Sequence, residues 1–162
     1  GGEIMHGVTG LAGEIGHSQG DPLGAICSCG NRGCLNPIVA ENRLVQLLSV
    51  THGNMTMDDL VAQANNGDPG CRRIIADTAV RIGQVAADLC ISIDPEVVVV
   101  GGKLAMAGEV FTQPFNEALQ RLLFPDAVMP ITVLSSPHPS DNCALGGALA
   151  AIGHAIRNSI AA

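Results

Sequence analysis

The sequence predicts an α/β domain with an at least partly parallel sheet. Two short runs of β-branched and apolar residues, 97–100 and 131–134, lack polar alternation, which is typical of strands buried on both faces. Segments with helical apolar spacing precede, separate and follow these runs, and that order favours the α/β class. Two clear strands are few for a sheet of this kind, so we expect the chain to be the C-terminal part of a larger fold.

The predicted helices have recognisable starts. Asp68 followed by Pro69 is a helix cap with proline at the first helical position, and apolar spacing then continues to near Ile93, over roughly 20–25 residues. Thr56 is a candidate cap for a shorter helix. Pro114 predicts a late start or a kink in a later helix. The remaining helices are predicted over residues 38–50, 56–65, 109–123 and 142–160.

The composition is apolar and acidic, which excludes some functions. The chain is 47% hydrophobic and 14% charged, with mean hydropathy +0.33 and net charge −7. The apolar excess indicates surface covered by further chain or a partner. Without a basic stripe, Trp or Tyr, the chain is not expected to bind DNA by itself. No signal peptide or membrane-length apolar run occurs, so we expect a cytoplasmic location and no membrane partner.

A cluster of metal-ligating residue types lies near the start of the chain. One imidazole and three thiols fall within a short segment: His17, Cys27, Cys29 and Cys34. Such a donor set suits structural Zn²⁺, and four protein ligands leave no open position for catalytic water. Glycines at 24, 30 and 33 would let the backbone turn the thiols inward. The alternative is three reduced thiols on a loop beside a surface histidine.

The other three cysteines have a different context. Cys71, Cys90 and Cys143 are dispersed in apolar helical segments. We expect them to be small buried hydrophobes, and the six cysteines together do not resemble a disulfide framework.

Several stretches resemble the ROK family (repressor, open reading frame, kinase) of bacterial sugar kinases and sugar-responsive repressors. They are Gly-Leu-Ala-Gly-Glu-Ile-Gly-His at 10–17, the Cys-Ser-Cys-Gly-Asn-Arg-Gly-Cys-Leu run at 27–35, Val-Val-Val-Val-Gly-Gly at 97–102 and Ala-Leu-Gly-Gly-Ala at 144–148. The resemblance implies an actin-like ATPase (ribonuclease H-like) fold that binds sugar between two lobes. In the kinases, nucleotide binds beside the second lobe.

The resemblance also implies how the chain divides. Residues 1–36 would be the sugar-site and zinc-binding loop region, and residues 37–162 the C-terminal α/β lobe. The family's Asp-x-Gly-Gly segment, catalytic aspartate, second glycine-rich phosphate loop and winged helix do not occur in this sequence. We therefore expect no catalytic residue here, no sugar phosphorylation by this chain alone, and DNA contact only through an N-terminal domain outside it.

The family's sugar contacts correspond to Glu14 and His17. A carboxylate can accept two sugar hydroxyls, and an imidazole held by zinc through one nitrogen can meet a hydroxyl through the other. Without the resemblance, Glu14 would be interpreted as a solvated loop carboxylate. The family's Cys-Leu-Glu becomes Cys-Leu-Asn here, so Asn36 replaces a sugar-binding glutamate and predicts altered specificity or weaker binding. Glu41 is not expected to substitute for it.

Three glycines match the family's adenosine contacts: Gly101, Gly102 and Gly146. A tight strand-to-helix turn explains the Gly-Gly pair equally well. The pair continues as Lys103-Leu104, and Gly-Gly-x-Leu is more frequent in the repressors of the family than in its kinases. Together with Asn36, this favours a regulator.

Three functions follow. The first is the effector-binding part of a transcriptional regulator, homo-oligomeric (dimer or tetramer) and sensing a sugar or amino sugar, with structural Zn²⁺. The alternative is the C-terminal half of a glucokinase-like sugar kinase, which would use ATP and Mg²⁺. The third, motivated by Asn36, is a zinc-stabilised interaction domain without a ligand.

Overall fold

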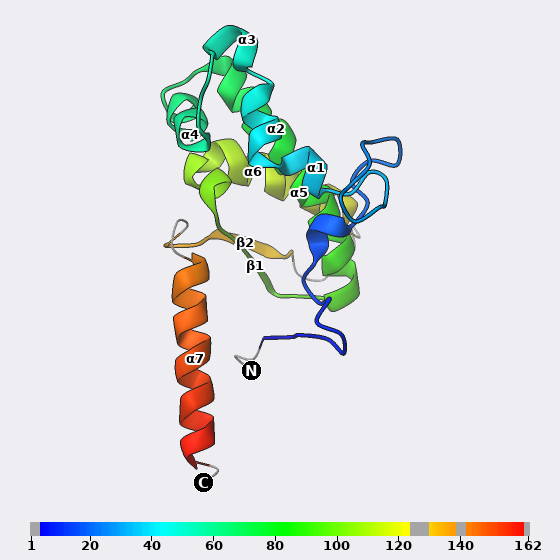
Figure 1. The fold of residues 1–162 in the computed structure, drawn as a ribbon, viewed down its shortest axis with the longest axis vertical. Coiled ribbons are helices and arrows are strands. Elements are labelled where there is room, and N and C mark those ends of the chain that lie inside the picture. The colour runs from blue at the N-terminus through cyan, green and yellow to red at the C-terminus, as the bar shows by residue number, and fades with distance from the viewer. Residues whose placement is uncertain (1–3, 124–129, 139–141, 161–162) are drawn as a thin grey trace.

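The computed structural model describes residues 4–123, 130–138 and 142–160 (Figure 1). The elements in chain order are η1 Ile15–His17, α1 Asn36–Val39, α2 Glu41–Gln46, α3 Ser49–His52, α4 Met57–Asn65, α5 Pro69–Ile93, β1 Val97–Val100, η2 Lys103–Ala107, α6 Glu109–Leu122, β2 Thr132–Ser135 and α7 Asn142–Ile160. The α/β class and the parallel pairing of the two strands are confirmed.

Helices α5 and α6 form the centre of the molecule. Asp68 caps α5 as predicted, since its Oδ1 accepts a hydrogen bond of 2.8 Å from the backbone N–H of Cys71. A Cβ built on Gly83 of α5 would lie 2.5 Å from the carbonyl oxygen of Phe115 and 3.1 Å from Cβ of Ala118. Glycine is therefore needed where the two helices cross, because any side chain would separate them.

The apolar core surrounds this crossing and extends to α4 and the strands. Several of its members have essentially no solvent exposure: Leu60, Ala64, Cys71, Ile75, Ala79, Ala87 and Leu119. Thr56 caps α4 through a reciprocal capping box with Asp59, which orients α4 for packing against α5. Cys71 and Cys90 are buried as predicted.

One predicted helix differs from the structure, and another has its predicted range although Pro114 suggested a late start. The single helix expected over 38–50 is three short helices, because Ala40 adopts an extended conformation between α1 and α2 and Leu48 leaves helical geometry before α3. The helix containing Pro114 begins at Glu109, directly after Gly108, whose φ of +59° ends η2. It continues through Pro114, which forfeits one backbone hydrogen bond without ending the helix.

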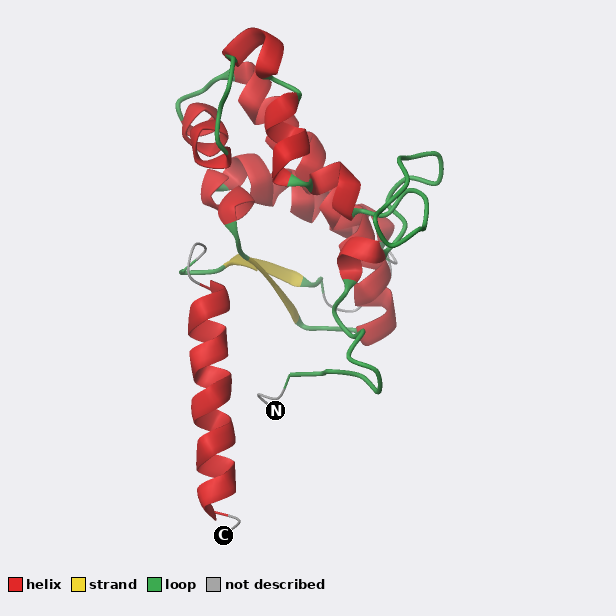
Figure 2. Cartoon of the chain, viewed as in Figure 1, coloured by secondary structure: helices red, strands yellow, loops and turns green. Residues whose placement is uncertain are grey.

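The sheet has two strands in parallel register, with Val97 opposite Thr132 (Figure 2). Side chains on one face, including Val98 and Val133, pack against the helical core. On the other face Val99 is 61% and Leu134 49% exposed. The expectation of strands buried on both faces is therefore wrong for this chain, because its core-forming helices cover only one face.

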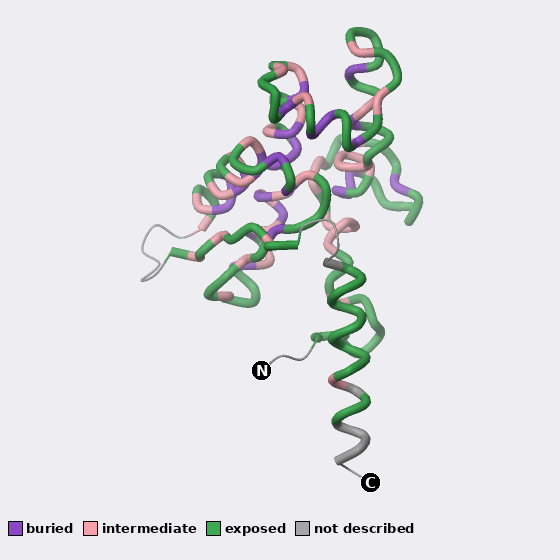
Figure 3. Tube along the Cα trace, turned by 90° about the vertical axis from the view of Figure 1, so that its left-hand side faces the viewer, coloured by how far each residue is buried: buried purple, intermediate pink, exposed green. Residues whose placement is uncertain are grey.

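Helix α7 has the predicted bounds and projects from the body (Figures 1 and 3). Its large apolar side chains are exposed: Leu145, Leu149, Ile152 and Ile156. Cys143 is also exposed, so the prediction that it is buried is wrong. Exposed apolar surface on α7 and on the sheet accounts for the apolar excess in the composition. Across the described ranges, none of the helices combines the length and apolarity that a membrane crossing needs.

Candidate metal and ligand site

The cysteine-bearing loop is folded by backbone hydrogen bonds rather than by regular secondary structure. Isolated antiparallel bridges join Gln19 to Cys34 and Ile26 to Arg32. Between them a tight turn forms, in which the N–H of Cys27 donates to the carbonyl of Asn31 at 2.8 Å. The chain thus folds back on itself and brings four residues from the 18-residue segment 17–34 into one cluster.

Glycine makes this path possible at two positions. Gly30 has φ +91° and Gly33 has φ +74°, as predicted for backbone that must turn the thiols inward. A Cβ on Gly33 would also overlap the carbonyl oxygen of Asp21. Gly24 differs from the expectation: it is not among the positive-φ residues, and it is constrained instead by a close approach to Asp21.

The four predicted ligands converge. Their donor atoms all lie within 4.8 Å of one another: His17, Cys27, Cys29 and Cys34. Nδ1 of His17 is 3.7 Å from Sγ of Cys27, and Sγ of Cys29 is 3.6 Å from Sγ of Cys34. A tetrahedron with metal–sulfur bonds of about 2.3 Å has edges of about 3.8 Å. The cluster therefore has the size and the donor set to hold one metal ion.

The thiols differ in their acidity. The pKa of Cys27 is lowered to about 6, first because the backbone N–H of Cys29 donates to its sulfur and then through contacts including His17. Burial raises the pKa of Cys34 to about 11. Cys27 is thus a ready thiolate ligand near neutral pH, whereas a metal ion would have to displace the proton of Cys34.

Two of the predicted sugar-binding residues lie at the two ends of the short helix η1. Glu14 immediately precedes it and is exposed, and its carboxylate has no partner among the residues that the structure describes. His17 ends the helix with Nδ1 toward the thiols, which leaves Nε2 for a second interaction. Ile15, between them, lines an apolar cavity of about 450 Å³ together with residues of α5 and β1. Ile15 thus places η1 at the rim of this cavity, beside α5 and β1, a position that the sequence did not indicate.

Asn36 lies against the same short helix. It is the exposed first residue of α1, and a Cβ built on Gly16 would overlap its Oδ1 atom. Asn36 thus meets η1 between Glu14 and His17, so the structure brings the three predicted sugar-binding residues together. Glu41 is engaged elsewhere, since its carboxylate is 3.8 Å from Nζ of Lys103.

Of the three candidate nucleotide-binding glycines, Gly101 lines the apolar cavity beside α5 and β1, and the lining of that cavity includes neither Gly102 nor Gly146. Gly102 has φ +86° and immediately precedes η2, so a tight turn after β1 explains it. Gly146 is on α7, where a Cβ would meet nothing within 4 Å. Lys103 beside them pairs with Asp58 at 3.5 Å.

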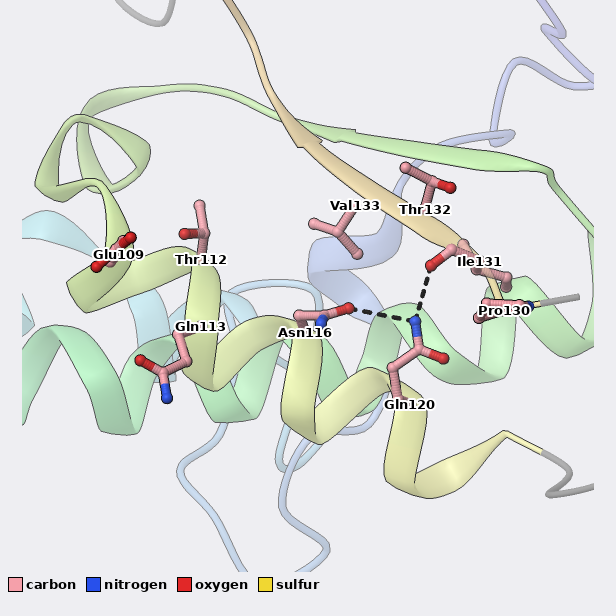
Figure 4. Close-up of a pocket in the computed structure, with 9 residues that line it drawn as sticks. All are labelled: Glu109, Thr112, Gln113, Asn116, Gln120, Pro130, Ile131, Thr132 and Val133. Atoms are coloured by element: carbon pink, nitrogen blue, oxygen red, sulfur yellow. Dashed lines mark hydrogen bonds between the residues drawn. The ribbon is translucent and has the colours of Figure 1, made fainter.

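A polar groove, which the sequence analysis did not predict, lies between α6 and β2 (Figure 4). Its volume is about 750 Å³. The groove is lined by Glu109, Thr112, Gln113, Asn116, Gln120, Pro130, Ile131, Thr132 and Val133. Helical spacing along α6 gave a signal for its polar face, but the sequence did not indicate that β2 would lie beside it.

The model of the ROK family matches residues 1–154, and the chain belongs to this family. The DNA-binding transcriptional repressor Mlc of Escherichia coli (strain K12) is 27% identical over 158 residues, covering 91% of this chain and 39% of Mlc. A glucokinase of Halalkalibacterium halodurans is 30% identical over 140 residues, covering 76% of this chain and 42% of that protein.

Solved structures agree on the fold. A ROK family glucokinase from Streptomyces griseus, crystallised with glucose and AMPPNP, superposes with TM-score 0.73 and 25% identity over 86% of this chain and 51% of that one. The chain therefore spans about half or less of the length of these relatives. They include both a repressor and kinases, so membership of the family leaves regulator and kinase as alternatives.

Proposed function

We propose that this chain is the effector-binding part of a sugar-responsive ROK transcriptional regulator, stabilised by one structural zinc ion. The observation that carries the proposal is the position of Glu14, His17 and Asn36 around one short helix, directly beside the cysteine cluster.

Zinc is the metal that the donor set favours. Three thiolates and one imidazole in a closed set of four are typical of structural zinc sites, which keep no open position for water. The ion would hold His17 through Nδ1, the nitrogen that lies 3.7 Å from Sγ of Cys27. Its role here would be to fix the tautomer and orientation of His17 so that Nε2 meets the ligand.

A sugar or amino sugar suits the remaining groups. The exposed carboxylate of Glu14 would accept hydroxyl hydrogen bonds, which are stronger when the acceptor is charged. Asn36 supplies both a donor and an acceptor but no charge. We infer that binding uses one charged acceptor where the family's usual pattern has two, which would retune specificity.

The regulator is favoured over the kinase by two features of the sequence. Asn36 replaces the family's glutamate, and the glycine pair continues as Lys103-Leu104. Sugar binding would shift the closure of two lobes and reposition DNA-binding domains in a homo-oligomer. The kinase remains the second candidate because glucokinases are among the relatives; ATP and Mg²⁺ would then approach Gly101, Gly102 and Gly146.

Calorimetry on the intact protein tests the proposal, with glucose, N-acetylglucosamine, N-acetylmannosamine and xylose as ligands. We expect one of them to bind, and Glu14→Gln to weaken that binding at least about tenfold because a charge-assisted hydrogen bond is lost. Glu117→Gln, on the exposed face of α6, is the matched control and should bind normally.

Two outcomes would overturn parts of this proposal. ATP-dependent phosphorylation of any of these sugars by the intact protein would replace the regulator with the kinase. If none of the four sugars binds while zinc is present, the sugar site is contradicted and the ligand-free interaction domain takes its place.

A further inference from the structure

The groove between α6 and β2 borders a strand edge that has no strand beside it among the described residues (Figure 4). The N–H of Thr132 donates to the carbonyl of Glu96 at 3.1 Å, and that of Ser136 donates to Val100 at 2.8 Å. In a parallel ladder alternate residues face the same neighbour. The backbone groups of Val133 therefore face away from β1, toward the groove side of the strand.

A side chain of α6 already uses this edge. Nε2 of Gln120 donates to the carbonyl of Ile131 at 2.7 Å and to Oδ1 of Asn116 at 3.2 Å. This contact shows that the free edge of β2 and the polar face of α6 border the same space. The other halves of these two amides, Oε1 of Gln120 and Nδ2 of Asn116, have no partner in the described part of the chain.

The chemistry of the groove fits a peptide backbone. Val133 presents one N–H and one C=O along the strand, and the two amides add one free donor and one free acceptor beside it. Such alternating donors and acceptors are the pattern that an added strand satisfies. Glu109 is the only charged residue among those that line the groove, so a basic side chain is favoured and an anionic ligand is disfavoured.

The same edge limits the length of the partner. Strand β2 has four residues, and Pro130 and Pro137 flank it. Because proline cannot donate to a ladder and favours strand ends, pairing cannot extend far in either direction. The expected partner is therefore a short extended segment rather than a long strand.

We propose that this groove binds a short, extended peptide segment of another protein that carries a lysine or arginine, added as a strand beside β2. The backbone of Val133 pairs with the peptide backbone, the amides of Asn116 and Gln120 contact its peptide groups, and Glu109 pairs with the basic side chain. This inference is independent of the sugar-site proposal, because it uses none of the same residues.

The test uses the intact protein and an acetylated, amidated peptide of sequence Thr-Val-Lys-Val-Thr, followed by amide NMR. We expect a dissociation constant on the order of 10⁻⁴ M, with shifts concentrated on the backbone N–H of Val133 and the side-chain amides of Asn116 and Gln120. Peptides N-methylated at alternate residues, in the two possible registers, provide the control. One register should bind at least about tenfold more weakly than the other, because a strand pairs through only one of its edges.

Removing the charge of Glu109 tests whether this residue pairs with the basic side chain of the peptide. Glu109→Gln should weaken the lysine peptide about threefold at low salt and leave a peptide with glutamine in place of lysine unchanged. Asp88→Asn removes a carboxylate from the exposed face of α5, outside the lining of this groove, and should leave both peptides unaffected.

Three results would overturn the proposal. These are the absence of shifts at millimolar peptide, equal binding of both N-methylated registers, and shifts at the same amides caused by free glucose rather than by peptide. The last result would assign the groove to a sugar.

Discussion

The cysteine-bearing loop and the helical body are stabilised in different ways. In the loop, residues 18–35, the buried residues are two cysteines, one glycine and one leucine (Figure 3). In the body, α4, α5 and α6 enclose a continuous apolar core. Burial of apolar surface can account for the body, but the loop has too little of it to be held in the same way.

Because the loop lacks an apolar core of its own, metal coordination is needed there and not in the helical body. The loop has hydrogen-bonded turns and three thiols that converge with the imidazole of His17, which would be an unstable arrangement without a shared ion. Helix η1 lies between the two regions, because Ile15 borders the cavity beside α5 and β1 and His17 meets the cluster.

The largest expected effect comes from breaking the cluster. Cys34→Ser should abolish metal binding and remove amide protection in the loop, since structural zinc contributes on the order of 10 kcal/mol in small zinc domains. Hydrogen exchange measures this, and amides of α5 should stay protected. Cys143→Ser, at an exposed cysteine, is the control. Equal loss of protection in α5 would contradict the separation of the two regions.

A substitution in the core should have the reverse effect of Cys34→Ser: it should destabilise the helical body and leave metal binding intact. Leu119 is fully buried between α5 and α6, so Leu119→Ala should lower the free energy of unfolding by about 3 kcal/mol through loss of burial and a cavity. Urea denaturation measures the change. Metal content should stay at the wild-type level, and Leu122→Ala, at a residue 46% exposed, should cost far less. Loss of metal in Leu119→Ala would show that loop and body are not separable.

A substitution at the contact between the regions addresses specificity. Asn36→Glu restores the residue typical of the family, and its added charge should raise affinity for the bound sugar roughly tenfold. Calorimetry checks this, with Asn42→Glu on α2 as the control for added charge. An unchanged affinity in Asn36→Glu would remove Asn36 from the proposed site.

The smallest effect is a pH dependence confined to the body. The Cys71 N–H and then His52 lower the pKa of Asp68 from 3.8 to about 2. Because the folded state favours the charged form, this contribution to stability is complete above about pH 4 and disappears as the pH falls through about 2. Thermal melts should show a steeper decline over this range for the wild type than for Asp68→Asn. Asp77→Asn, at an exposed ion pair, should behave like the wild type.

Local signals in the sequence predicted much of this structure. The cap at Asp68 and the end of α5 at Ile93 were predicted, as was the convergence of the four candidate ligands, because capping and ligand spacing depend on near neighbours in the chain. The contact between Gly16 and Asn36 was not, since it depends on how the loop doubles back over 20 residues.

Features that depend on packing partners were predicted less well. Val97–Val100 has the composition of a fully buried strand, yet its burial requires elements on both faces, and the described chain supplies one. The predicted burial of Cys143 is wrong for the same reason, because no described element packs over this side chain. The groove beside β2 could not be predicted, because it depends on which side chains of α6 face the strand.

The zinc content of the intact protein, purified without added metal, is the decisive test of whether the four ligands hold a structural zinc ion. Elemental analysis should find about one zinc per chain in the wild type and almost none in Cys34→Ser, because a closed set of four ligands retains the ion through purification. The structural zinc site would be contradicted if the wild type is folded and has reduced thiols but contains less than about a tenth of a zinc per chain.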